Sequence, residues 1–160
     1  MRQGLAGYHE LEMAGGDSRP GGEALAAIMI VAIDTSVLLA IFNAEPGAGD
    51  WLDVLIGARR AGRLVASDIV YAELAPAFSS RIALDAALAK LGVNFDPIRE
   101  EAAWLAGTTF KAYRKAGGPR RQLIPDFLVA AHAKLQADKL AAIDRGYIRT
   151  YFPDLVLLEP

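Results

Sequence analysis

Short apolar runs alternate with helical patterns along most of this 160-residue chain. The strand-like runs cover residues 30–33, 64–66, 93–95, 140–143 and 155–158. The helical patterns cover residues 36–43, 49–61, 82–91, 98–113 and 125–137, with one more helix starting near Ser67 and Asp68. Such alternation predicts an α/β fold of three α/β/α layers, with a central, mainly parallel sheet and helices on both faces.

Composition narrows the class of protein. Hydrophobic residues make up 53% of the chain and charged residues 22%, as in ordinary globular proteins that bury a core. The absence of cysteine excludes disulfides, zinc–thiolate sites and cysteine nucleophiles. Because the formal net charge is −2, any binding of nucleic acid must depend on a local basic patch rather than on the overall field.

The first 28 residues differ from the rest. Six glycines and one proline fall within residues 1–23, without sustained periodicity, which predicts a flexible extension over 1–28 before a domain over 29–160. The longest strongly apolar stretch, residues 24–33, is shorter than the roughly 20 residues that span a bilayer. We therefore expect a cytoplasmic protein that does not enter the membrane.

Four acidic residues stand beside apolar runs: Asp34, Glu73, Asp126 and Asp144. Asp34 and Asp144 end predicted strands, and Glu73 and Asp126 lie early in predicted helices that can begin at the same edge of the sheet. Buried carboxylates are normally paired or bound to metal, and carboxylate oxygens suit Mg²⁺ or Mn²⁺. The pattern favours one shared cation site.

Simpler interpretations exist for the individual acids. Asp34 is a preferred capping residue for the helix that follows it, and Asp126 is a favourable charge in the first turn of its helix. Asp144, before Arg145 and Gly146, fits an ordinary turn. Glu73 is the hardest to explain in this way, given its apolar neighbours. Only the joint pattern favours a metal site.

The ordered motifs resemble those of the PIN domain family, and more narrowly the VapC-type toxins of bacterial toxin–antitoxin pairs. The motifs are Ile33-Asp34-Thr35-Ser36, Tyr71-Ala72-Glu73-Leu74, the run from Pro125-Asp126-Phe127 to His132-Ala133, and Asp144-Arg145-Gly146-Tyr147. The resemblance implies a Mg²⁺- or Mn²⁺-dependent endoribonuclease. On this basis Asp34, Glu73 and Asp126 are the main metal ligands, and Asp144 binds directly, through water, or positions the nucleophile.

The resemblance also implies a homodimer and a cognate antitoxin that blocks the acidic pocket. One position departs from the family pattern: Ala142 stands where a serine or threonine hydroxyl is common, which leaves open whether one metal ion or two bind. The alternative is a weak or inactive module of the same fold that acts through its antitoxin or its dimer. A phosphotransfer domain with Asp34 as nucleophile is disfavoured, because Ser36 stands where such motifs carry a second aspartate.

Basic residues gather before the Asp126 helix. Between Lys111 and Arg121 the chain contains no acid, and Arg114, Lys115, Arg120 and Arg121 are candidate RNA contacts together with Arg145. Cations beside phosphodiesters gain affinity through counterion release. Equally, lysine and arginine are favoured near helix C-termini, so a solvated helix end explains the same residues.

Overall fold

A computed structural model of the protein describes residues 27–119, 124–143 and 146–160. Its sheet contains the strands β1 (Met29–Ile33), β2 (Gly62–Ala66), β3 (Val93–Phe95), β4 (Lys139–Ala141) and β5 (Leu157–Leu158). The strand order is β3-β2-β1-β4-β5, and every neighbouring pair is parallel. The predicted α/β fold with a parallel central sheet is confirmed.

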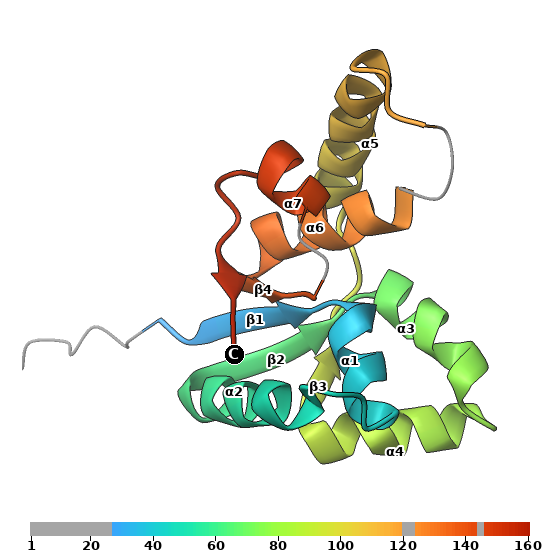
Figure 1. The fold of residues 1–160 in the computed structure, drawn as a ribbon, viewed down its shortest axis with the longest axis vertical. Coiled ribbons are helices and arrows are strands. Elements are labelled where there is room, and N and C mark those ends of the chain that lie inside the picture. Colours follow the sequence, from blue (N-terminus) through green and yellow to red (C-terminus); the bar gives the residue numbers. More distant parts are fainter. Residues whose placement is uncertain (1–26, 120–123, 144–145) are drawn as a thin grey trace, which may run out of the picture.

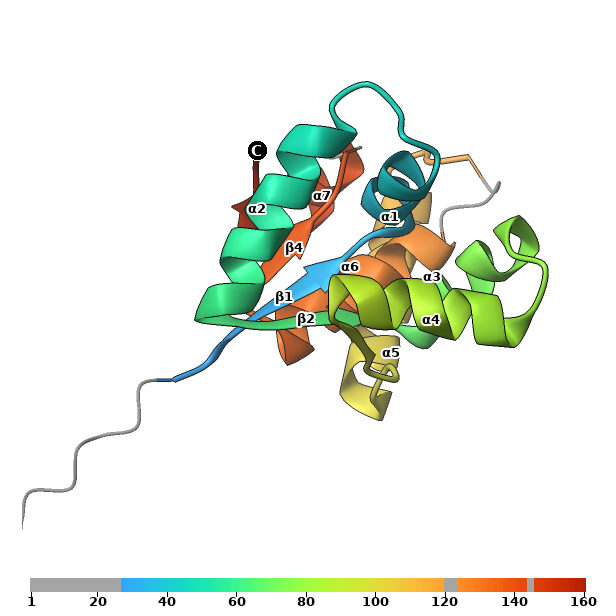
Figure 2. The same cartoon turned by 90° about the horizontal axis from the view of Figure 1, so that it is seen from below.

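Helices cover both faces of this sheet. They are α1 (Thr35–Phe42), α2 (Ala48–Ala61), α3 (Asp68–Leu74), α4 (Arg81–Leu91), α5 (Glu100–Lys115), α6 (Ile124–Gln136) and α7 (Gly146–Tyr151), with a short 3-10 turn at Ala75–Ala77. Figure 1 shows α1, α2 and α4 on one side of the sheet and α5, α6 and α7 on the other. Figure 2, seen from below, has α2 and α4 in front of the strands. The described ranges contain no helix that is long and apolar enough to cross a membrane.

The middle of the sheet is buried on both faces. Val31, Ala32 and Ile33 of β1 are at most 1% exposed, as are Leu140 and Ala141 of β4. Central strands of a parallel sheet are covered by helices on both sides, so they appear in the sequence as continuous apolar runs.

An aromatic cluster holds the α5–α6–α7 layer together. The Phe127 ring lies 5.5–5.8 Å, centroid to centroid, from five other rings: Phe110, Tyr113, Tyr147, Tyr151 and Phe152. Such ring pairs add stabilisation beyond their buried area. Because Phe127 follows Asp126 directly, the cluster also fixes the first turn of α6.

Parallel strands bring their carboxyl ends to one edge of the sheet. α1 and α3 begin at that edge because they follow β1 and β2. α6 starts there as well, because it runs back across the sheet before β4. Helix N-termini carry a partial positive charge, so this edge favours anionic side chains.

Candidate metal centre

Asp34 lies where β1 passes into α1. Its side chain caps the helix: Oδ2 accepts hydrogen bonds from the Ser36 amide at 3.1 Å and from the Ser36 hydroxyl. The Asp34 amide donates to the Ala141 carbonyl oxygen of β4 at 2.8 Å. The capping interpretation is therefore confirmed, and it leaves Oδ1 without a hydrogen bond to any residue that the structure describes.

Ser36 connects the ends of two strands. Besides donating to Asp34, its hydroxyl oxygen accepts a hydrogen bond from the Ile143 amide at 3.2 Å. Ile143 follows β4 and immediately precedes Asp144 in the sequence. The Ser36 hydroxyl thus joins the Asp34 carboxylate to the segment just after β4.

Glu73 approaches the same helix start from α3. Thr35, the first residue of α1, is 9% exposed and donates its hydroxyl to Glu73 Oε2 at 2.5 Å. The Asp34 and Glu73 carboxylates are therefore each held by a hydroxyl from the first two residues of α1. Sequence reasoning noted Ser36 but missed Thr35, whose signal was its position directly after Asp34.

The predicted burial of Glu73 is wrong. The residue is exposed, because Val70 and Leu74, one turn apart on α3, take the buried face of the helix. The cost of burying a charge is therefore no argument for a cation bound at Glu73. The hydrogen bond from Thr35 is what brings its carboxylate to the start of α1.

Asp126 is half-buried in the first turn of α6, and its carbonyl oxygen accepts a hydrogen bond from the Tyr147 hydroxyl at 3.5 Å. Asp144 lies outside the described residues. Among the residues that are described, no three acidic or histidine side chains lie close enough together to hold a metal ion. The convergence of all four acids stays a prediction.

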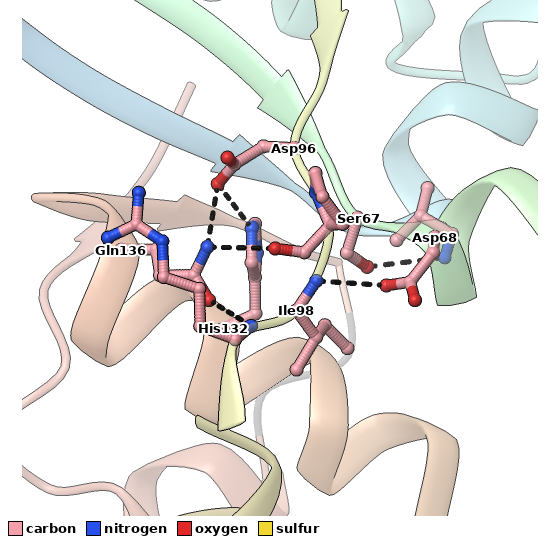
Figure 3. Close-up of polar contacts among 9 residues, drawn as sticks. Ser67, Asp68, Asp96, Ile98, His132 and Gln136 are labelled. Atoms are coloured by element: carbon pink, nitrogen blue, oxygen red, sulfur yellow. Dashed lines mark hydrogen bonds and ion pairs between the residues drawn. The ribbon is translucent and has the colours of Figure 1, made fainter. Parts of the chain in front are cut away.

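Figure 3 shows what anchors α6 to the connection between β3 and α5. His132 is 1% exposed, and its Nε2 lies 2.8 Å from Asp96 Oδ2, which also accepts from Gln136 Nε2 at 3.0 Å. Gln136 Oε1 accepts from the Arg99 amide at 2.8 Å, and Asp68 Oδ1 accepts from the Ile98 amide at 3.2 Å. The bonds of His132 and Gln136 connect α6, which carries Asp126, to residues 96–99, and the Asp68 bond connects α3 to the same segment. His132 is therefore packed in the interior of the domain.

A second contact anchors α3 to α4. The Tyr71 hydroxyl, two residues before Glu73, donates to Asp85 Oδ1 at 2.6 Å. This hydrogen bond to a carboxylate is the main reason why the pKa of Tyr71 is raised above its usual value of 10.0, with desolvation and the Asp85 charge adding to the effect. Tyr71 thus stays protonated and keeps α3 attached to α4.

The candidate RNA contacts are only partly described. Arg114 is half-buried near the end of α5 and donates from Nη1 to the Gly118 carbonyl oxygen at 3.0 Å. Lys115 ends α5 and is exposed. Arg120, Arg121 and Arg145 lie outside the described residues.

Solved structures share this fold at low sequence identity. VapBC2 from Rickettsia felis, bound to a DNA fragment from its promoter, has a chain with a TM-score of 0.61 and 18% identity, over 81% of this chain and 97% of that one. VapBC-1 from nontypeable Haemophilus influenzae has a chain with a TM-score of 0.58 and 24% identity, over 81% of this chain and 96% of that one. A toxin–antitoxin complex from Klebsiella pneumoniae has a chain with a TM-score of 0.56 and 17% identity, over 74% of this chain and 89% of that one.

A search of curated protein sequences gave no match. The sequence profile of the PIN domain matches residues 31–153, which run from β1 to the end of α7 and just beyond. Since this match takes in four of the five strands and all the acids of the candidate site, the chain belongs to the PIN domain family.

Proposed function

We propose that this chain is a metal-dependent endoribonuclease and acts as the VapC-type toxin of a toxin–antitoxin pair. The observation that carries the proposal is the pair of carboxylates at the start of α1. Asp34 and Glu73 come from different elements, and each accepts a hydrogen bond from one of two adjacent hydroxyls. Capping of α1 explains the hydrogen bonds of Asp34, whereas the bond from Thr35 brings the Glu73 carboxylate of another helix to the same helix start.

The proposed metal ligands are Asp34, Glu73 and Asp126, with Asp144 binding directly, through water, or positioning the nucleophile. Their oxygen donors fit Mg²⁺ or Mn²⁺. When bound, such a cation makes water nucleophilic and neutralises the charge that develops on the phosphodiester. The Thr35 and Ser36 hydroxyls orient two of the carboxylates.

For RNA, we propose that Arg114, Lys115, Arg120, Arg121 and Arg145 contact the phosphates. Each phosphate contact adds close to one unit to the salt slope of binding, so affinity for RNA falls steeply as salt rises. The site of action on this proposal is the cytoplasm, where RNA is available.

The proposed protein partners are a cognate antitoxin and a second copy of the chain. The structures with this fold include VapBC assemblies and a toxin–antitoxin complex, which supports an antitoxin partner. We propose that the antitoxin blocks the acidic edge by supplying a positive charge where the metal otherwise binds.

An inactive binding module of the same fold is the second candidate. Ala142 favours it, because this position has no hydroxyl to support a metal ion or its water. The lack of a three-ligand group among the described residues also leaves room for it.

Cleavage of a structured RNA by purified protein separates the two candidates. Wild type is expected to cleave with Mg²⁺ or Mn²⁺ and to stop when a chelator is added. Asp34→Asn, which removes a charge with little change in volume, is expected to keep the fold and lose cleavage by at least 100-fold, a rough figure for removing a group that organises catalysis.

Two outcomes contradict the nuclease proposal. Equal cleavage by wild type and Asp34→Asn indicates a contaminating nuclease. Failure of wild type to cleave any RNA or to bind metal favours the inactive module. Expression without the antitoxin adds a cellular readout, since only the wild type is expected to arrest growth.

A further inference from the structure

Four cationic residues lie at the amino-terminal edge of the sheet, opposite the edge that carries the candidate metal centre. Arg59 and Arg60 belong to the last turn of α2, Arg63 is the second residue of β2, and Lys90 belongs to the last turn of α4. All four are exposed. Figure 1 shows α2 and α4 ending at the side of the molecule where the strands begin, away from the starts of α1 and α3.

Two observations bring these cations together in space. The Arg59 side chain crosses from α2 to the end of α4, so that a Cβ added to Gly92 would collide with its guanidinium group. Continuing the register between β2 and β3 by one residue places Arg63 at the level of the same glycine. Lys90 lies two residues before Gly92 in the sequence. Positive charges from three elements therefore gather around the end of α4.

Acidic residues are missing from the segments that carry these charges. Residues 54–67 contain three arginines and no aspartate or glutamate, and residues 86–95 contain one lysine and no acid. In the described part of the chain, none of the four cations takes part in an ion pair. The edge therefore has a local positive field, although the whole chain has a formal net charge of −2.

Helix dipoles explain only some of these charges. A cation is favoured in the last turn of a helix, which accounts for Arg59, Arg60 and Lys90 taken one at a time. Arg63 lies in a strand, so no helix dipole accounts for it. Like charges that lie close together repel one another, and an anionic partner removes that repulsion. The four cations together therefore favour an anionic ligand.

We infer that this basic edge, defined as Arg59, Arg60, Arg63 and Lys90, binds phosphates of the RNA that the candidate metal centre cleaves. The side chains are exposed and come from three elements, so they form an open surface that suits a chain of phosphates rather than one small enclosed anion. Contacts to phosphates position a nucleic acid without reading its sequence. The choice of RNA rests on the proposed function.

The separation of the two edges determines which RNA can touch both. Arg63 pairs in register with Ile30 of β1, and Asp34 follows Ile30 by four residues (34 − 30). At about 3.3 Å per residue, the edges are at least about 13 Å apart. Phosphates along one strand of a duplex advance by roughly 3.4 Å each. A folded RNA reaches both edges, whereas a trinucleotide bound at the metal centre does not.

Binding of RNA without metal tests the inference separately from cleavage. A labelled RNA hairpin is titrated with the full chain in EDTA, and fluorescence anisotropy is followed at several salt concentrations. Arg59→Gln/Arg60→Gln/Arg63→Gln is expected to weaken binding by about tenfold or more at low salt and to reduce the salt slope by about two units. Arg60→Gln/Lys90→Gln leaves the contact of Arg59 with Gly92 in place and is expected to lose roughly half of that slope.

Arg81→Gln/Lys134→Gln/Arg149→Gln is the matched control, because it removes the same number of positive charges at other places on the surface. Each of these three cations pairs with an acid of the chain. Breaking such exposed pairs costs little stability, and binding of the hairpin is expected to stay within about threefold of wild type. Thermal melting of every variant checks the fold.

Cleavage adds a second readout. The triple variant of the basic edge is expected to raise KM for the hairpin with kcat unchanged, and to leave cleavage of a trinucleotide unchanged. A wild type that binds the hairpin but cleaves no RNA contradicts the proposed nuclease and not this inference. Three results overturn the inference: equal affinity of the triple variant and wild type for the hairpin, an equal loss in the control, or binding of a DNA hairpin of the same sequence at least about tenfold more tightly than the RNA.

Discussion

At the scale of single residues, the capping role of Asp34 leaves one of its carboxylate oxygens for the proposed metal ion. Its Oδ2 oxygen caps α1 through Ser36, while Oδ1 has no hydrogen bond among the described residues. Asp34 stands directly after the buried strand β1, as the sequence predicts, and its role as a metal ligand stays a prediction. The physical argument for Glu73 was wrong, since this residue is exposed and its carboxylate accepts a hydrogen bond from Thr35, and its role as a metal ligand stays a prediction.

The contact between Thr35 and Glu73 leads to a prediction for Thr35→Val, which replaces the hydroxyl by a methyl group of similar size. The fold is expected to persist with a loss of about 1 kcal/mol, the typical net value of a hydrogen bond. The apparent affinity for Mn²⁺ is expected to fall several-fold, because the Glu73 carboxylate loses the donor that orients it. Calorimetry and chemical unfolding measure the two effects.

Thr150→Val is the control for this substitution, because the Thr150 hydroxyl donates within α7 to the Gly146 carbonyl oxygen. It is expected to leave Mn²⁺ binding unchanged. Equal Mn²⁺ affinity in Thr35→Val and wild type would mean that Thr35 only stabilises the fold.

At the scale of elements, the contact between His132 and Asp96 connects α6 to the segment that follows β3. His132 is recognisable in the sequence as a polar residue in an apolar helix. Its partner is not, because Asp96 lies in a distant turn and only the tertiary fold brings the two together. The same holds for the acids of the candidate site. Motifs single them out in the sequence, but the sequence does not give the distances between the elements that carry them.

His132→Ala tests the anchoring role of this contact. The substitution leaves a cavity and removes one partner of the Asp96 carboxylate, so unfolding free energy is expected to fall by about 2–4 kcal/mol. Arg149→Ala is the control, since it breaks the exposed pair between Arg149 and Glu159 and is expected to cost at most about 1 kcal/mol. Chemical denaturation measures both, and similar losses would show that His132 does not anchor α6.

At the scale of the whole molecule, the sequence predicts the layers of the fold better than its shortest helix and the length of its last strand. The apolar runs revealed the parallel sheet because its central strands are buried on both faces. Helix α7 was missed, because six residues are too few for a helical pattern and α7 depends on packing of Tyr147 and Tyr151 against Phe127. The last strand is shorter than predicted, with only Leu157 and Leu158 in the sheet.

The claim on which the functional account depends is that four acids from four parts of the chain share one cation. Isothermal titration calorimetry, in which Mn²⁺ is titrated into the purified protein, tests this claim directly and is unaffected by contaminating nucleases. The variants to compare are Asp34→Asn, Glu73→Gln, Asp126→Asn and Asp144→Asn, with Asp154→Asn as an exposed control. The account predicts saturable binding by wild type and by the control, and binding weakened at least tenfold in Asp34→Asn, Glu73→Gln and Asp126→Asn. Binding by those three variants that equals wild type, or no binding by wild type, would contradict it.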